Sequence, residues 1–431
     1  MTTARCITLA ACSVLGVALV VADDSSVKNI ITGEAAFGDF KSESPGTVRK
    51  ITVTDLPAPF ATKGVANNAK MVPRPADAWP KVKEGFKVEL YAGNVTEPRE
   101  IRRAPNGDLF VAETYAGQVE IFRGVKDGKP EQRSVFAKGL KNNFGIAFYP
   151  PGDNPQWVYF GNTNSVVRYP YHNGDLEATG PAQTIIPKLA PSTGGHTTRD
   201  LAFSPDGSKL FVSVGSGSNI DDPDTHPKEF HRANILQFTP DGKFLKVFAS
   251  GIRNPVGIAI NQTTGELWCS VNERDMIGDN LVPDYITSVK EDGFYGWPWY
   301  YIGNHHDPRL PEKPDLGSRA SVPDILLRAH NASLEMTFYD GNQFPSQYKG
   351  DVFAAEHGSW NRSSRTGYEV IRAPLDNGHA KGEYEDFMTG FVNPDGTVWG
   401  RPVGVAVAPD GSLMVTDDGS KSIWRVSYTG K

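Results

Sequence analysis

Four short segments of the sequence carry polar side chains that could do chemistry, and each one precedes a similar apolar stretch. The segments are Asn142-Asn143, Gly194 to Arg199, Arg253-Asn254-Pro255 and Gly400-Arg401-Pro402. An imidazole can accept a proton near neutral pH, whereas a guanidinium stays charged and can grip a carboxylate with two hydrogen bonds. If the apolar stretches are equivalent strands around one axis, His196 and three arginines converge at one mouth. The arginines are Arg199, Arg253 and Arg401, and the segments therefore predict an electropositive pocket for an anionic ligand.

Each of these residues also has a structural interpretation. A loop histidine is more often solvated or structural than catalytic, and arginines can cap strand ends or pair with surface acids. The equivalent placement of Arg253 and Arg401 before repeated strands favours a functional role.

A second group of polar residues runs from Asn272 to Asp275 and continues from Gly278 to Tyr285. Its carboxylates and backbone carbonyls are the hard oxygen ligands that Ca²⁺ prefers. The spacing does not match an EF-hand, so composition alone leaves a solvated acidic loop as the alternative.

A repeated strand pair must position these loops. Each copy consists of an apolar strand, a tight turn with Asn, Asp or Gly, and a second apolar strand, because these residues tolerate the positive φ angles of tight hairpins. The copies lie at Ile101 to Ala112, Gly145 to Phe160, Leu201 to Val214, Val256 to Val271, Phe338 to Ala355 and Val403 to Val415. Their spacing matches one four-stranded blade per repeat, and the sequence predicts an all-β, six-bladed β-propeller.

Composition agrees with many short strands and excludes some functions. The 431 residues include 44 Gly and 32 Pro, which disfavours a helical bundle. A net charge of −6 gives no basic footprint for a nucleic acid.

The N-terminal 80 residues predict two segments outside the propeller. An apolar run from Ile7 to Val21 ends at Ala22, which predicts a secretory signal peptide over 1–22 rather than a membrane span. Lipoprotein processing at Cys12 is the rival interpretation. Residues 23–80 lack periodicity and predict an extended N-terminal arm lying on the propeller domain of 81–431. The mature protein is then expected to be exported, either periplasmic or secreted.

Cysteine usage limits the redox chemistry of the chain. Cys6 and Cys12 fall in the predicted signal peptide, so Cys269 would stand alone and form no intrachain disulfide. No Cys-x-x-Cys-His motif for haem attachment occurs in the sequence.

The sequence resembles the pyrroloquinoline quinone (PQQ) dependent sugar dehydrogenases, most closely the sorbosone dehydrogenase branch. The resemblance runs from about Pro57 to Tyr428. Its most specific stretches are Gly195 to Val214, Arg253 to Gly257, Asn272 to Tyr285, Gly293 to Pro298, His357 to Arg362 and Val398 to Val405. The family fold is a six-bladed propeller with the cofactor at the channel mouth.

The resemblance implies roles for particular residues. His196 matches the catalytic base, and Arg253 and Asn254 match cofactor contacts. Arg401 matches an arginine that grips a cofactor carboxylate. The stretch from Asn272 through Glu273 to Arg274 matches the Ca²⁺ loop, which contributes main-chain carbonyls.

The sequence departs from soluble glucose dehydrogenases of the family at two positions. The segment from His357 to Arg362 has no lysine where those enzymes have one, and Val403 stands where they have a second arginine. Arg362 is the candidate substitute for a cofactor contact.

The resemblance implies oxidation of a sugar or sugar aldehyde to a lactone or acid by hydride transfer to PQQ. Ca²⁺ would polarise the quinone, and His196 would take the hydroxyl proton. Because no haem motif occurs, a separate electron acceptor, a cytochrome or quinone, is expected. The alternatives are a Ca²⁺-dependent lactonase, which should line the axis with carboxylates, and a non-catalytic ligand-binding propeller.

Overall fold

A computed structural model describes residues 29–430 of the chain. The predicted signal peptide and the Cys12 alternative lie outside these residues. Within residues 29–430, no helix has the length and the hydrophobicity that crossing a bilayer requires.

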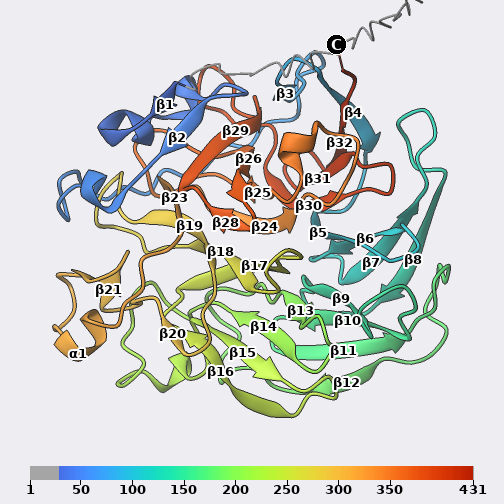
Figure 1. Cartoon of the computed structure of the whole chain (residues 1–431), viewed down its shortest axis with the longest axis horizontal. Helices are drawn as coiled ribbons and strands as arrows, with labels where there is room; N and C mark the ends of the chain where they lie inside the picture. The colour runs from blue at the N-terminus through green and yellow to red at the C-terminus, as the bar shows by residue number, and fades with distance from the viewer. Residues whose placement is uncertain (1–28, 431) are drawn as a thin grey trace, which may run out of the picture.

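Six sheets of at least four strands surround a central axis, and Figure 1 views them along the shortest dimension of the molecule. Sheet 1 contains β5 (Pro98–Arg103), β6 (Leu109–Glu113), β7 (Gln118–Arg123) and β8 (Gln132–Lys138); sheet 2 contains β9 (Ile146–Tyr149), β10 (Trp157–Asn162), β11 (Ser165–Pro170) and β12 (Gln183–Ile186). Sheet 3 contains β13 (Leu201–Phe203), β14 (Leu210–Val214), β15 (Asn234–Phe238), β16 (Phe244–Ser250) and β20 (Gly293–Phe294); sheet 4 contains β17 (Asn254–Ile260), β18 (Leu267–Asn272), β19 (Pro283–Ser288) and β23 (Ile325–Ala329).

The last two sheets contain strands that are distant in sequence. Sheet 5 contains β24 (Ser333–Phe338), β25 (Val352–Glu356), β26 (Glu369–Ala373) and β29 (Glu383–Thr389), extended by β1 (Ile30–Ile31), β2 (Val48–Lys50) and β3 (Lys81–Val82). Sheet 6 contains β30 (Pro402–Val407), β31 (Leu413–Asp417), β32 (Ser422–Tyr428) and β4 (Phe86–Ala92). The antiparallel pairing of β32 with β4 closes the ring, since it joins the C-terminal strand to an early one. The prediction of an all-β propeller is therefore confirmed.

The connections contain short elements. They are η1 (Gly33–Phe37), η2 (Phe40–Ser42), η3 (Val53–Asp55), η4 (Pro227–Glu229), η5 (Ser346–Tyr348), α1 (Pro314–Gly317), β21 (Tyr300–Tyr301), β22 (His305–His306), β27 (Leu375–Asp376) and β28 (His379–Ala380).

Each predicted strand pair is the first hairpin of one sheet. The turn glycines Gly107 and Gly207 have φ angles of +94° and +69°, a conformation that favours glycine. The irregular copy differs from the prediction, because its first strand begins at Ser333 rather than near Phe338.

Apolar side chains fill the space between neighbouring sheets. Tyr159 and Leu210 pack between sheets 2 and 3, while Trp268 and Phe353 belong to the clusters on either side of sheet 5. Leu109 and Met414 pack together between sheet 1 and sheet 6, so the ring of apolar contacts is continuous across the closure. This core holds the strand ends that carry the loops in fixed positions.

The described part of the predicted arm is attached to sheet 5. Strand β2 pairs antiparallel with β29, and β1 pairs parallel with β2 (Figure 1). Farther along, the Val72 N–H donates to the Val398 carbonyl at 2.9 Å. Residues 29–80 therefore lie on the propeller, although they contain short strands and 3₁₀ turns.

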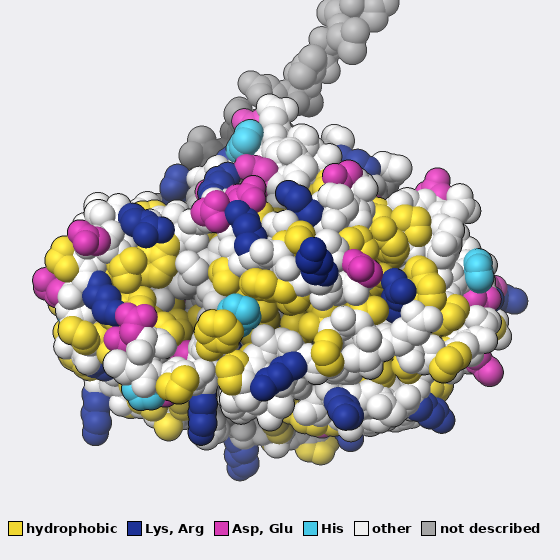
Figure 2. Space-filling view, turned by 90° about the horizontal axis from the view of Figure 1, so that it is seen from below, with side chains coloured by type: hydrophobic (Ala, Val, Ile, Leu, Met, Phe, Trp, Pro, Cys, Tyr) yellow, Lys and Arg dark blue, Asp and Glu magenta, His cyan; other side chains and the backbone are white. Residues whose placement is uncertain are grey.

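Lys and Arg side chains are spread over the face in Figure 2 and do not form a single patch. This face gives no sign of the continuous basic surface that phosphate backbones require.

Candidate active site

A cavity of about 430 Å³ lies where loops from several sheets meet. Its size is within the usual range for small-molecule sites. The lining residues include His196 before β13, Arg253 before β17, Asn272 at the end of β18 and His357 after β25. Of the residues that the sequence predicts to converge, His196 and Arg253 line this cavity.

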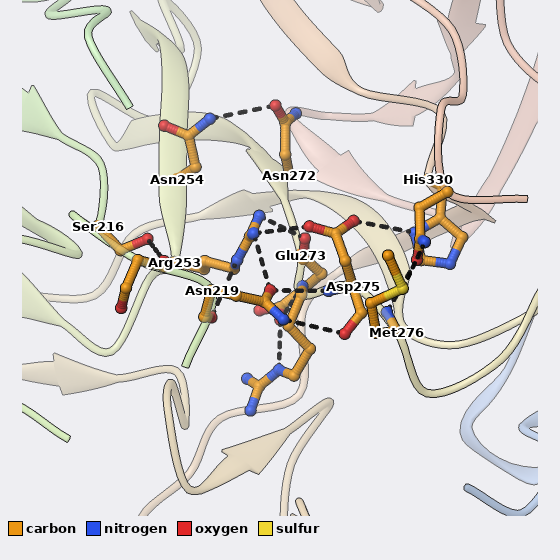
Figure 3. Close-up of polar contacts among 12 residues, drawn as sticks. Ser216, Asn219, Arg253, Asn254, Asn272, Glu273, Asp275, Met276 and His330 are labelled. Carbon is orange, nitrogen blue, oxygen red and sulfur yellow. Dashed lines mark hydrogen bonds and ion pairs between the residues drawn. The ribbon is translucent and has the colours of Figure 1, made fainter. Parts of the chain in front are cut away.

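Arg253 is the centre of the polar network in this cavity (Figure 3). Its Nη2 donates to Asp275 Oδ2 at 2.8 Å and to Asn219 Oδ1 at 2.9 Å, and its Nη1 donates to the Glu273 carbonyl at 2.6 Å. The side chain is almost fully buried. Arg253 therefore holds the loop after β18 as well as facing the cavity.

His196 is oriented by its own neighbourhood. Its Nδ1 lies 3.0 Å from the Ser216 carbonyl oxygen and 3.1 Å from Ser216 Oγ. A carbonyl can only accept, so Nδ1 carries the hydrogen and Nε2 keeps its lone pair. Burial, with the charge of Arg253 as a second cause, lowers the pKa of His196 to about 3. The imidazole is therefore neutral at physiological pH.

Asn254 and Asn272 face each other across the start of the β17–β18 pair. The Asn254 Nδ2 donates to Asn272 Oδ1 at 3.1 Å, and the Asn272 amide donates to the Ser333 carbonyl. Asn272 lines the cavity, whereas the Oδ1 of Asn254 is buried and accepts no hydrogen bond from the described residues.

The predicted metal loop has its two central side chains turned toward each other. Arg274 Nε donates to Glu273 Oε2 at 2.9 Å, and both side chains are fully buried. The Arg274 guanidinium also donates to the Pro298 and Tyr300 carbonyls, away from the cavity lining. Glu273 Oε1 is buried without a hydrogen-bond partner among residues 29–430, so one carboxylate oxygen remains for a hard cation.

Three predicted arginines lie outside the cavity lining. Arg199 folds back onto the carbonyls of His196 and Thr198, and burial lowers its pKa to about 9. Arg362 donates to Phe37 O and to Asn280 Oδ1, so it joins the N-terminal segment to the loop after β18. The expectation that Arg199, Arg253 and Arg401 line one pocket is therefore wrong in geometry, because only Arg253 reaches it.

Arg401 is connected to the cavity only through Asp418 and His357. Its Nε donates to Asp418 Oδ1 at 3.0 Å, and Arg99 donates to Asp418 Oδ2 at 2.8 Å. Both oxygens of Asp418 lie 3.0 Å from Nε2 of His357, which does line the cavity. Two arginines thus fix a carboxylate that orients a second imidazole.

The cavity lining also contains more carboxylates than the sequence predicts. Glu273, Asp275 and Asp284 line it beside Arg253. Burial raises the pKa of Asp284 to about 7, while Arg253 helps to hold the pKa of Asp275 below its ordinary value. The pocket is mixed in charge, and an anionic ligand would need a cation beside it.

Sequence reasoning missed several lining residues. His330, held by Asp275 at 3.5 Å and by the Gly278 carbonyl at 3.0 Å, follows the outer strand β23, where the repeat gives no signal. His357 and Trp360 lie in a stretch that carried the family resemblance, and their place after β25 could have indicated them.

An all-β propeller with a polar, histidine-containing cavity at one mouth is the class that this fold and site define. The family model described as TrAA12-like matches residues 80–290 and 316–429. The chain belongs to this family.

Several proteins are similar to this chain over most of its length. An uncharacterized protein of Borreliella burgdorferi is 32% identical over 362 residues, covering 81% of this chain and 90% of that protein. A pyrroloquinoline quinone-dependent pyranose dehydrogenase of Coprinopsis cinerea is 25% identical over 80% of this chain, which spans only 54% of that enzyme. The solved PQQ domain of the C. cinerea pyranose dehydrogenase, in its holo form, superposes with a TM-score of 0.68 at 23% identity, covering 82% of this chain and 98% of that domain.

Proposed function

We propose that this protein is a PQQ-dependent oxidoreductase that oxidises a sugar or sugar aldehyde to a lactone or acid. The observation that supports this most directly is His196, a neutral imidazole that keeps a lone pair on Nε2 and lines a cavity together with Arg253. The membership of the TrAA12-like family and the relative named as a pyranose dehydrogenase support the same class of reaction.

The residues present fit such a cofactor together with Ca²⁺. The cavity has the volume of a small-molecule site, and its arginine suits a carboxylate of the cofactor. The unpartnered Glu273 Oε1 suits the metal, and Asn254 and Asn272 offer amide groups nearby. When bound, PQQ supplies an ortho-quinone that accepts a hydride, and Ca²⁺ polarises its carbonyl as a Lewis acid.

The protein contributes proton transfer, orientation and binding. Nε2 of His196 takes the proton of the substrate hydroxyl, since Ser216 fixes Nδ1 as the protonated nitrogen. Arg253 lowers the basicity of His196 in the free protein, and an anionic ligand beside Arg253 would offset this effect. Asp418 orients His357 on the other side of the cavity.

The same proposal covers the architecture and the outer arginines. Each of the six sheets is one propeller blade, and the propeller domain spans 81–431. Arg362 and Arg401 support the site indirectly, through hydrogen bonds to Asn280 and Asp418. The mature protein begins near Asp23, outside the cytoplasm, and passes electrons to a separate cytochrome or quinone. Sequencing the N-terminus of exported protein tests the processing, and an intact Met1 or a lipid on Cys12 would contradict it.

Reconstitution of the purified protein tests the reaction. PQQ and Ca²⁺ are added together or singly, and reduction of a dye acceptor is followed with a panel of aldoses, pyranoses and sorbosone. Activity that needs both additions supports the proposal. Hydrolysis of lactones with Ca²⁺ alone, which Asp275 and Asp284 could support, would instead assign a lactonase, and sugar binding without turnover a binding propeller.

A further inference from the structure

Three carboxylates meet at the centre of the channel, away from the cavity of His196. They are Glu100 on β5, Asp200 directly before β13, and Glu335 on β24, and all three are fully buried. They come from sheets 1, 3 and 5, which alternate around the ring (Figure 1). One oxygen of each carboxylate lies within 4.8 Å of the corresponding oxygens of the other two.

Glycines hold the equivalent places in the other three sheets. Gly145, Gly257 and Gly404 each stand directly before the first residue of the regular pairing with the second strand of their sheet. Glu100, Asp200 and Glu335 stand at the same place in sheets 1, 3 and 5. A Cβ on Gly145 would lie 2.8 Å from the Cα of Asp200, and one on Gly257 would lie 2.8 Å from the Cα of Glu335. Only glycine lets the acid-bearing strands approach this closely.

Two of the acids are held by the strand that follows. The Ile146 N–H donates to Glu100 Oε1 at 3.0 Å, and the Ile258 N–H donates to Asp200 Oδ2 at 2.7 Å. Glu335 breaks this pattern, because in the part of the chain that the structure describes neither of its oxygens accepts a hydrogen bond. Glu100 Oε2 is also without a partner among these residues.

One guanidinium serves all three carboxylates. Arg102 Nη2 lies 2.7 Å from Glu100, 3.1 Å from Asp200 and 3.1 Å from Glu335. Three ionised carboxylates and one arginine leave two negative charges in a buried place, which is strongly unfavourable unless they are neutralised. Two protons or one divalent cation would neutralise them.

We propose that Glu335, Glu100 and Asp200 bind one hard divalent cation, preferably Ca²⁺, at the centre of the channel. The oxygens that Arg102 leaves free, Glu335 Oε2 and Glu100 Oε2, provide the unsatisfied ligands. The 4.8 Å spread suits an ion that sits about 2.3–2.6 Å from each oxygen. This site is separate from the proposed Ca²⁺ at the mouth, and its ion ties sheets 1, 3 and 5 together.

Calcium counting on the full chain without PQQ tests the site. The protein is dialysed against chelator and then titrated with Ca²⁺, and the bound ion is measured per chain. Glu335→Gln should bind one Ca²⁺ fewer per chain, or bind that ion at least about tenfold more weakly. Loss of a hydrogen-bond partner of a metal ligand already weakens metal affinity by about tenfold or more, and Glu335 is proposed as a ligand itself. Glu356→Gln is the matched control, because Glu356 is an equally buried glutamate on the neighbouring strand β25 and lies outside the cluster.

Thermal unfolding distinguishes a cation from two protons. In chelator, Glu335→Gln should be at least as stable as the wild type, because it removes a buried charge; in Ca²⁺ the order should reverse. Equal calcium counts in wild type and Glu335→Gln, or a wild-type midpoint that Ca²⁺ does not raise, would overturn the proposal. If Glu335→Gln fails to fold, the proposal is tested by the effect of Ca²⁺ on the wild-type midpoint and by the calcium count of Glu100→Gln. Since PQQ is absent throughout, a failure of the proposed reaction leaves this result unaffected.

Discussion

At the scale of single residues, the cavity contains a side chain suited to proton transfer, His196, and another suited to binding an anion, Arg253. His196 has a free Nε2 and a fixed Nδ1, whereas Arg253 stays charged and uses its donors on Asp275, Asn219 and the Glu273 carbonyl. Because Arg253 is already paired, its replacement would disturb the loop as well as the ligand contact.

His196→Ala should retain PQQ binding and lower the saturated turnover by about 10²-fold or more, the usual scale for a positioned base. Arg253→Ala should weaken PQQ affinity by about 1.5–3 kcal/mol, the scale of a charge-assisted hydrogen bond, with activity partly restored at high PQQ. Affinity and saturated rate are measured by titrating PQQ into each variant. His172→Ala, an exposed histidine, is the control. Full saturated activity of His196→Ala would show that His196 is not the base.

Glu356 is a buried acid that makes stability depend on pH. Burial raises the pKa of Glu356 from 4.5 to about 8 in the folded protein. Between these values the folded state keeps a proton that the unfolded state releases, so the free energy of unfolding falls as pH rises, by up to about 1.4 kcal/mol per pH unit for one group. The contribution is fully present below pH 4.5 and is lost by about pH 8.

Glu356→Gln should therefore flatten the decline of unfolding free energy over this window. Denaturant unfolding at several pH values measures it for wild type and variant. Parallel curves would mean that Glu356 does not hold the extra proton.

At the scale of elements, the N-terminal segment is joined to the propeller by a buried ion pair as well as by strand pairing. Arg49 on β2 donates to both carboxylate oxygens of Asp386 on β29, at 3.2 and 3.3 Å, and both side chains are fully buried. The Arg49 guanidinium also donates to the Ser42 carbonyl at 2.8 Å.

Arg49→Ala should lower the free energy of unfolding by about 3–5 kcal/mol, because it leaves a buried carboxylate without its partner. Lys83→Ala is the comparison, since Lys83 is half exposed and 3.8 Å from Glu385, so its loss should cost about 1 kcal/mol or less. Denaturant unfolding of both variants gives the two values. A similar small effect from both would show that Arg49 does not hold the segment in place.

At the scale of the whole molecule, the fold depends on closure of the ring. Among residues 29–430, β4 is hydrogen-bonded in sheet 6 to β32 alone, with Tyr428 opposite Phe86. Trp424 of β32 is fully buried in the cluster between sheets 5 and 6. Without β32, β4 loses this strand partner, and the interfaces of sheet 6 with sheets 5 and 1 are exposed.

Removal of residues 421–431 should abolish cooperative unfolding, because the ring can no longer close. Removal of 429–431 alone, which leaves β32 intact, should change the midpoint little. Calorimetry of the two truncated proteins measures the difference, and a wild-type transition in the shorter protein would contradict the role of closure.

The sequence by itself determined the repeated hairpins, the propeller class and the expectation that the loops of His196 and Arg253 meet at one mouth. These depend on turn residues and apolar alternation, which are local and act within each hairpin. Only the tertiary structure decided that Arg401 holds Asp418 rather than facing the cavity, and that Glu100, Asp200 and Glu335 meet at the centre of the channel. The physical reason is that hydrogen bonds and ion pairs join residues far apart in the chain, so a donor's partner follows from how the sheets pack and not from its own neighbours in sequence.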